Sequence, residues 1–219
     1  MWVKICANTN LEDALLAGEA GANAVGFVFA ESPRRVTLKQ VAAITPHLPS
    51  SLDKFGVFVD SGFDKIAQTV VECGLTGVQL HVAHDPLLAA KLRERFGPEF
   101  TILRVIHYSQ DLEVQLKTAQ ADHAISGVLV DSRTATAVGG TGVRFDWKAA
   151  RRGFLETASH LRLIAAGGLN PVNVAEAIQT LGPWGVDVAS GVEAAPGKKD
   201  PALVKAFVSA ARAGAAIIA

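Results

Sequence analysis

Short runs of β-branched and aliphatic residues recur along this chain, and each is followed by a stretch with helical periodicity. Runs such as AVGFVF, FGVFV and GVLV are almost continuously apolar. Runs of this kind are typical of parallel strands that are covered on both faces. The alternation therefore favours a parallel sheet whose strands are connected by helices.

Eight such units are predicted. The expected strands are Val3–Cys6, Ala24–Phe29, Lys54–Val59, Gly77–His81, Thr101–Val105, Gly127–Asp131, Leu161–Ala165 and Gly185–Ala189. The expected helices are Leu11–Ala20, Leu38–Leu48, Asp64–Cys73, Pro86–Phe96, Leu112–Ala119, Trp147–Arg151, Val172–Leu181 and Pro201–Arg212. A chain of 219 residues over eight units has roughly 27 residues per unit, which favours a single (β/α)8 TIM barrel over a doubly wound open sheet. Because no linker or low-complexity segment interrupts the pattern, we expect one domain over residues 1–219.

The charge balance bears on which kinds of partner the protein can bind. The chain has 21 basic and 21 acidic residues, so its formal net charge is zero. Nucleic-acid binders and membrane-surface proteins usually need a basic face, so neither class is expected. A small anionic ligand remains compatible, because a few local donors suffice to bind it. Two cysteines and the absence of a signal-peptide pattern favour a reducing cytoplasm.

In a barrel, the reactive residues lie at the carboxyl ends of the strands and in the loops that follow. Cys6 ends the first expected strand and Asp131 ends the sixth. A buried cysteine is often only a small apolar side chain, and an aspartate there often only caps a loop. Facing each other across the mouth, a thiol and a carboxyl group would instead suit proton-transfer catalysis as base and acid.

Two glycine turns near the end of the chain predict a phosphate site. Glycines after the seventh strand let a ligand approach the backbone, and Asn170 is a suitable N-cap for the helix that follows. Free N–H groups at such a helix start bind anions, and barrels often hold phosphate between the last two loops. The predicted phosphate-binding residues are Gly167, Gly168, Ser190 and Gly191.

Other polar residues have two readings each. Arg35 could clamp an anion or simply be a solvated loop cation. Lys4, inside a strand, should be paired with a carboxylate such as Asp187. His81 and His84 form an HxxH pair, but without further Cys or His ligands we expect no metal site. A glycine-rich loop, VGGTG at 138–142, precedes the helix expected at Trp147–Arg151 and is a candidate functional loop.

Several of these segments together resemble one family. The runs VKICANTNLEDA, SPRRV, VQLH, LVDS, GGTG, FDW, AAGGLNPVNV and VDVASGVEAAPGKKD occur in the order found in phosphoribosylanthranilate isomerases and span the whole chain. The resemblance implies a (β/α)8 barrel that acts without cofactor on N-(5-phosphoribosyl)anthranilate, a phosphosugar of tryptophan biosynthesis.

The resemblance also implies roles for matching residues. Cys6 corresponds to the family's general base and Asp131 to its general acid. Arg35 would contact the anthranilate part, and His81 and Asp187 would line the pocket.

This chain departs from the family pattern next to these residues. Ala7 stands where a glycine is usual, and Asn8 where an aliphatic residue is common. Ala189 lacks a hydroxyl that the family usually has near the phosphate, and Arg34 adds a second arginine. These departures bear on affinity more than on the type of reaction.

The implied reaction is an Amadori rearrangement, and other readings fit less well. Indole-glycerol-phosphate synthases need lysines at strand ends, and metal-dependent epimerases need a ligand cluster; this chain has neither pattern. A non-catalytic phosphate binder would be expected to lose Cys6 or Asp131, and a bifunctional isomerase usually replaces the thiol with an aspartate. The sequence leaves open both a monomer and a homodimer.

Overall fold

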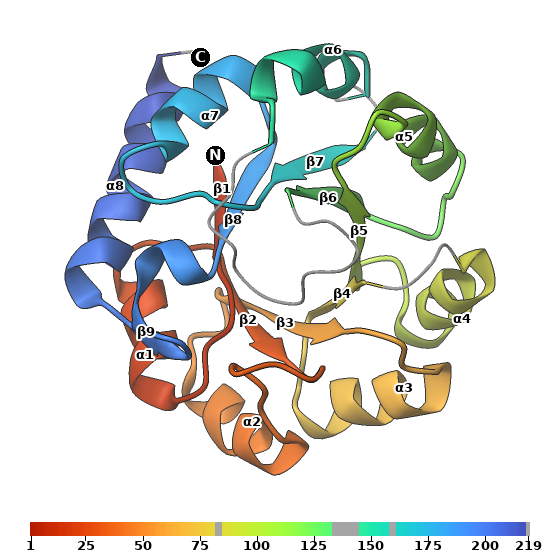
Figure 1. Cartoon of the computed structure of the whole chain (residues 1–219). Helices are drawn as coiled ribbons and strands as arrows, with labels where there is room; N and C mark the ends of the chain where they lie inside the picture. The colour runs from red at the N-terminus through yellow and green to blue at the C-terminus, as the bar shows by residue number, and fades with distance from the viewer. Residues whose placement is uncertain (82–84, 133–144, 158–160, 218–219) are drawn as a thin grey trace.

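A computed structural model of the protein describes residues 1–81, 85–132, 145–157 and 161–217. Eight parallel strands form a closed barrel in sequence order, and β1 pairs with β8 to close it. Figure 1 looks down the barrel and shows the helices as a ring around the strands. The predicted (β/α)8 barrel is confirmed.

The elements lie close to the predicted ranges. The barrel strands are β1 Trp2–Ile5, β2 Ala24–Val28, β3 Asp53–Phe58, β4 Gly77–Leu80, β5 Thr101–His107, β6 Gly127–Asp131, β7 Arg162–Ala165 and β8 Gly185–Val188. The α-helices are α1 Leu11–Glu19, α2 Leu38–Ile44, α3 Phe63–Glu72, α4 Pro86–Phe96, α5 Leu112–Gln120, α6 Trp147–Thr157, α7 Val174–Leu181 and α8 Pro201–Ala216. None of the described helices is long and apolar enough to cross a membrane.

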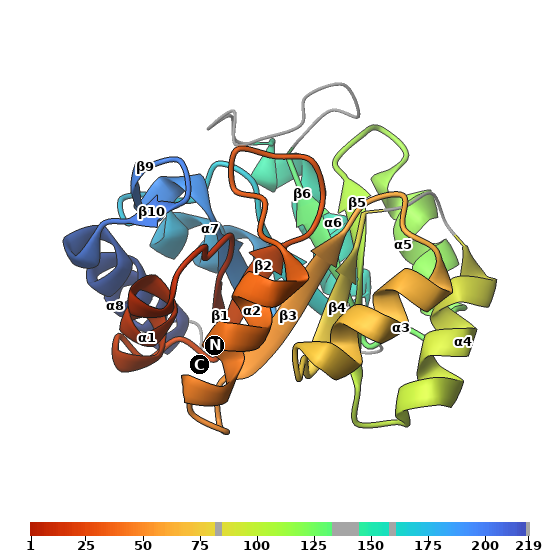
Figure 2. The same cartoon turned by 90° about the horizontal axis from the view of Figure 1, so that it is seen from below.

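Three local features differ from the prediction. Helix α6 runs to Thr157, beyond the short helix expected, because Phe154 continues its apolar face into the core. A 3₁₀ turn, η1 (Thr45–His47), replaces the end of the second expected helix, with Pro46 at its first turn. After β8 the chain forms the 3₁₀ turn η2 (Ser190–Val192) and a small antiparallel hairpin of β9 (Glu193–Ala195) and β10 (Lys198–Lys199). Figure 2 shows β9 and β10 beside the mouth of the barrel.

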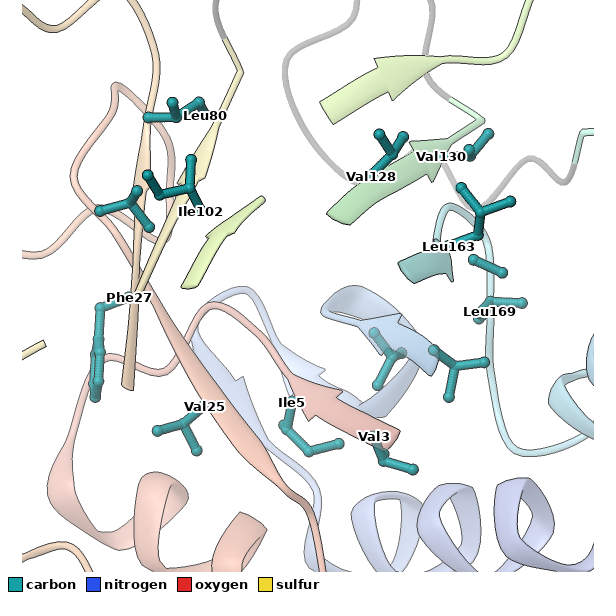
Figure 3. Packing of buried hydrophobic residues seen from close by; sticks show 14 of the residues in the cluster. Val3, Ile5, Val25, Phe27, Leu80, Ile102, Val128, Val130, Leu163 and Leu169 are labelled. Atoms are coloured by element: carbon teal, nitrogen blue, oxygen red, sulfur yellow. The ribbon is translucent and has the colours of Figure 1, made fainter. Parts of the chain in front are cut away.

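Side chains alternate between two apolar layers along each strand. The larger layer lies between strands and helices, and Figure 3 shows Val3, Ile5 and Val25 pointing from β1 and β2 into it. The smaller layer fills the inside of the barrel and includes Phe55 and Leu129. Because Val3 and Ile5 point outward, the same alternation turns the side chains of Lys4 and Cys6 inward.

Candidate active site

Two adjoining cavities open at the carboxyl ends of the strands. The first has a volume of about 620 Å³ and the second about 360 Å³. Cys6, His81, Asp131 and Asp187, all predicted from the sequence, line the first. Gly167, Gly168, Ser190 and Gly191 line the second. Asp131, Asp187 and Ala189 line both, so a single elongated ligand can occupy the two cavities together.

A buried polar network lies beneath Cys6 inside the barrel. The Lys4 ammonium donates hydrogen bonds to Asp187 Oδ1 and to Gln79 Oε1, both at 2.8 Å, and Lys4 is fully buried. Lys4 is also close enough to Cys6 for its charge to lower the pKa of the thiol. The Gln79 amide lies 2.9 Å from His81 Nε2, which connects the network to the first cavity. The expected pairing of Lys4 with Asp187 is confirmed.

The charge balance around Cys6 keeps its thiol protonated in the free protein. Burial raises the pKa of the Cys6 thiol, and the Asp187 carboxylate raises it further. Lys4 and Lys199 lower the pKa of Cys6, but they do not outweigh burial. Burial alone would lower the pKa of Lys4, whereas the Asp187 carboxylate raises it above its ordinary value, so Lys4 stays an ammonium ion.

Gly26 on β2 makes room for this arrangement. A Cβ at Gly26 would lie 2.7 Å from Cys6 Sγ and 3.2 Å from Lys4 Nζ. Real Cβ atoms essentially never approach that closely to a sulfur. Only a glycine there lets the thiol and the ammonium lie side by side, a requirement that sequence analysis did not detect.

The second cavity is formed where the β7 and β8 loops touch. Gly167 and Gly168 have φ angles of 79° and 65°, which glycine adopts without strain. A Cβ at Gly191 would lie 1.9 Å from the carbonyl oxygen of Leu169, and one at Gly167 would lie 2.6 Å from Asp131 Oδ1. Gly191 therefore lets the β8 loop pack against the β7 loop, and Gly167 lets the β7 loop approach Asp131.

The backbone N–H groups at the start of the helix after β7 are already hydrogen-bonded. Asn170 caps the turn that leads into α7, as expected: its Oδ1 accepts hydrogen bonds from the N–H groups of Val172 and Asn173, and its carbonyl oxygen accepts one from Val174. Those two donors are therefore occupied. The turn η2 follows Ala189, which provides no side-chain cap. Its first N–H groups have no partner within the turn and are the better anion donors.

Of the two neighbouring arginines, it is Arg34 that lines the first cavity. Its Nε and Nη2 donate three hydrogen bonds of 2.7–3.0 Å to the Glu193 carboxylate, whose side chain is 4% exposed. Arg35, predicted as the anion contact, instead pairs with Glu31 at 2.6 Å. The Arg35 side chain is 53% exposed, and it is not among the residues that line the cavity.

The β9–β10 hairpin supplies a second buried ion pair. Lys199 Nζ lies 3.2 Å from Glu193 Oε1 and 3.2 Å from the carbonyl oxygen of Ala189. Burial lowers the pKa of Lys199, whereas Glu193 raises it. Burial would raise the pKa of Glu193, but Arg34 and Lys199 bring it below its ordinary value.

Some predictions fall outside the described residues, namely the 138–142 loop and His84. Within the described ranges, no group of three or more His, Cys, Asp or Glu side chains is arranged to hold a metal ion. The sequence analysis missed the role of Glu193 and Lys199, although both belong to the SGVEAAPGKKD run that it singled out.

Comparisons with known proteins agree with this geometry. The family model of N-(5'phosphoribosyl)anthranilate (PRA) isomerase matches residues 3–210. An isomerase of that name from Pelobacter propionicus is 42% identical over 211 residues, covering 96% of this chain and 95% of the relative. The crystal structure of the enzyme from Thermotoga maritima is 37% identical, with a TM-score of 0.85 and coverage of 97% and 99% of the two chains.

A further solved structure is a phosphoribosyl anthranilate isomerase in complex with reduced 1-(o-carboxyphenylamino)-1-deoxyribulose 5-phosphate. It is 36% identical, with a TM-score of 0.81 and coverage of 97% of this chain and 99% of the other. With a matching family model over nearly its whole length and relatives of 40% and 42% identity, this chain belongs to the N-(5'-phosphoribosyl)anthranilate isomerase family.

Proposed function

We propose that this protein isomerises N-(5'-phosphoribosyl)anthranilate for tryptophan biosynthesis, with Cys6 as general base and Asp131 as general acid. The observation that carries the proposal is the placement of both residues in one cavity that continues into a glycine-lined pocket. Strands β1 and β6, which present them, are separated around the barrel by β7 and β8. A sugar bound between them would therefore have an acid on one side and a base on the other.

The ligand's two anionic ends find donors at the two ends of the joined cavities. Its phosphate fits against Gly167, Gly168, Ser190 and Gly191, where the backbone N–H groups of η2 are the donors. Its anthranilate carboxylate fits the guanidinium of Arg34. Arg34 therefore takes the role that sequence analysis assigned to Arg35, because it is Arg34 that lines the cavity.

The proposed reaction conserves all atoms. Protonated Asp131 gives its proton to the furanose ring oxygen, the bond from that oxygen to C1′ breaks, and the ring opens to a protonated Schiff base. The Cys6 thiolate then removes the proton from C2′, which yields an enolamine. The enolamine tautomerises to the ketone as the hydroxyl proton on O2′ is lost and C1′ gains a proton. His81 and Asp187 line the pocket around the opened sugar.

Lys4 makes the base chemically accessible. Burial favours the neutral thiol of Cys6, so only a small fraction is thiolate at neutral pH. The Lys4 ammonium, which lowers the pKa of Cys6, stabilises that fraction. Burial disfavours the thiolate and Lys4 favours it. Lys4 is in turn held in place by its hydrogen bond to Asp187.

The test is the decay of the fluorescence of phosphoribosylanthranilate generated in the cuvette, followed with wild type, Cys6→Ala and Asp131→Asn. We expect rapid decay with wild type and a loss of turnover of at least two orders of magnitude, on the scale of general acid–base catalysis, in each variant. Cys73→Ala is the matched control, because Cys73 is a buried free thiol that lines neither cavity. Near-normal turnover in a folded Cys6 or Asp131 variant would remove that residue's role.

We further propose that the protein acts in the cytoplasm as one catalytic domain. Both cysteines, Cys6 and Cys73, are free thiols, which suits a reducing compartment. Fractionation of the host cell with antibody detection tests the compartment, and recovery of the protein outside the cytoplasmic fraction would contradict it.

A further inference from the structure

The two ends of the joined cavities are connected by one buried chain of charges. It begins at Arg34 in the first cavity, continues through the Glu193 carboxylate to Lys199, and ends on the carbonyl oxygen of Ala189. Ala189 lines both cavities and directly precedes η2, the turn assigned to phosphate. The chain of contacts thus runs from one anion site to the other.

Each contact in this chain restricts the next group. Glu193 binds Arg34 through Nε and Nη2 together, so the plane of the guanidinium is fixed, and Nη1 carries none of these bonds. The side chains of Glu193 and Lys199 are 4% and 0% exposed. Neither can therefore move into solvent while the hairpin stays in place.

The hairpin that carries both residues is itself anchored to the mouth. Thr9 Oγ1 donates a hydrogen bond to the carbonyl oxygen of Gly197 at 2.6 Å, and the Lys199 N–H donates to Asp13 Oδ2 at 3.0 Å. The N–H of Gly197 also donates to Glu193 Oε1 at 3.3 Å. The contacts of Thr9 and Asp13 fix the hairpin against the loop that follows Cys6 and against the first turn of α1.

We propose that Glu193 and Lys199 are positioning residues that form a brace between the two anion sites and fix the orientation of Arg34 relative to the phosphate turn. This inference rests on the proposed function, because it assigns Arg34 and η2 to the two ends of one ligand. Neither brace residue lines either of the two cavities. Together they select ligands whose two anionic groups have the separation found in N-(5'-phosphoribosyl)anthranilate.

The test compares Glu193→Gln and Glu193→Asp with wild type. Glutamine keeps the size of the side chain but loses the charge that holds Arg34 and Lys199, whereas aspartate keeps the charge and shortens the reach. For Glu193→Gln we expect KM to rise at least tenfold while kcat falls less than threefold. We expect the inhibition constant of inorganic phosphate to stay within twofold of wild type, because the η2 backbone remains. The KM of Glu193→Asp should lie between that of wild type and that of Glu193→Gln.

The matched control is Glu113→Gln, which breaks an exposed arginine–carboxylate pair with Arg152 on the outside of the barrel. It should leave all three constants within twofold of wild type. A KM within twofold of wild type in folded Glu193→Gln would overturn the brace. A parallel rise of KM and of the inhibition constant of inorganic phosphate would also overturn the brace, because it indicates a general structural role. If Glu193→Gln does not fold, Glu193→Asp decides by the same criteria, with a threefold rise of KM as the threshold.

Wild-type turnover in the same assay separates this inference from the proposed function. If wild type does not consume the substrate, the proposed function fails and the brace fails with it. If wild type turns over normally and the variants keep its KM, only the brace is overturned.

Discussion

Lys4 Nζ lies 2.8 Å from Asp187 Oδ1 inside the barrel, and the charge of the same ammonium lowers the pKa of the Cys6 thiol. The pair thus places one positive charge directly beneath the proposed base. Burial and Asp187 raise the pKa of the Cys6 thiol, and Lys4 opposes them. The pH dependence of the reaction should therefore depend on Lys4.

Because the pKa of Cys6 is raised, the thiolate fraction and kcat/KM should keep rising from pH 7 through pH 9. Lys4→Met removes the charge that lowers this pKa, so the rising limb should move to higher pH. A shift of about one unit lowers the thiolate fraction about tenfold at neutral pH. The variant's deficit in kcat/KM should therefore shrink as the pH increases, which pH–rate profiles measure.

Lys54→Met serves as the control for this change. Lys54 is also a nearly buried strand lysine, but its ammonium donates only to the backbone carbonyls of Pro49 and Leu52. Its pH profile should match that of wild type. A Lys4→Met deficit of equal size at every pH would argue that Lys4 acts on structure alone, since an unpaired Asp187 costs stability of about 3–5 kcal/mol.

Substitutions of Arg34 and of Arg35 should have clearly different effects on KM. Arg34→Ala should raise KM at least tenfold with a smaller effect on kcat, because it removes the cation that lines the cavity. Arg35→Ala should change KM less than twofold, since an exposed ion pair such as that of Arg35 with Glu31 is worth about 0–1 kcal/mol. Steady-state kinetics on both variants decide the assignment, and the opposite ranking would return the role to Arg35.

The arginine pair shows where sequence reasoning reaches its limit. The barrel follows from the regular succession of apolar runs and helical stretches, and the positions of Cys6 and Asp131 at its mouth follow from their places at strand ends, which sequence displays directly. Loop residues have no such period. Which arginine enters the cavity depends on the turn that pairs Val28 with Arg35 and on Glu193, which lies 159 positions away from Arg34.

For the glycine-rich end of the chain, the sequence predicted a shared cavity but not the local hydrogen bonds around it. The glycines of both loops do meet at one cavity, as their spacing after β7 and β8 indicated. Asn170 and Asn173 are both good capping residues, and only the fold decides that Asn170 accepts the capping hydrogen bonds whereas the Asn173 side chain bonds the backbone of Gly168 and Asn170. The β9–β10 hairpin has too few residues to show periodicity, so its ion pair could not be predicted from pattern.

Gly26 should be intolerant of even one extra methyl group. In Gly26→Ala the new Cβ would meet Cys6 Sγ at 2.7 Å, so the sulfur must move. A displacement of about 1 Å at a reacting group can cost about 100-fold in rate, and overpacking costs about 1–3 kcal/mol of stability. We expect kcat to fall at least tenfold, measured together with urea unfolding.

Gly62→Ala is the matched substitution, because nothing lies within 4 Å of a Cβ built there. It should leave kcat unchanged. If Gly26→Ala kept wild-type kcat, the close packing of Cys6 against β2 would not be needed for the reaction.

Ala7 holds a backbone conformation that favours glycine, with φ at 63°. The left-handed region costs a residue with a Cβ about 1–2 kcal/mol. Replacing Ala7 by glycine removes that cost. The greater conformational freedom of glycine in the unfolded chain lowers the free energy of unfolding by about 0.4–1 kcal/mol. Ala7→Gly should therefore raise the free energy of unfolding by about 0.5 kcal/mol on the balance of these terms. The control is Ala121→Gly at an exposed position with φ at −78°, which should lower it by about 0.5–1 kcal/mol. Urea unfolding of both variants measures the difference, and a loss of stability in Ala7→Gly as large as in the control would mean that Ala7 is unstrained.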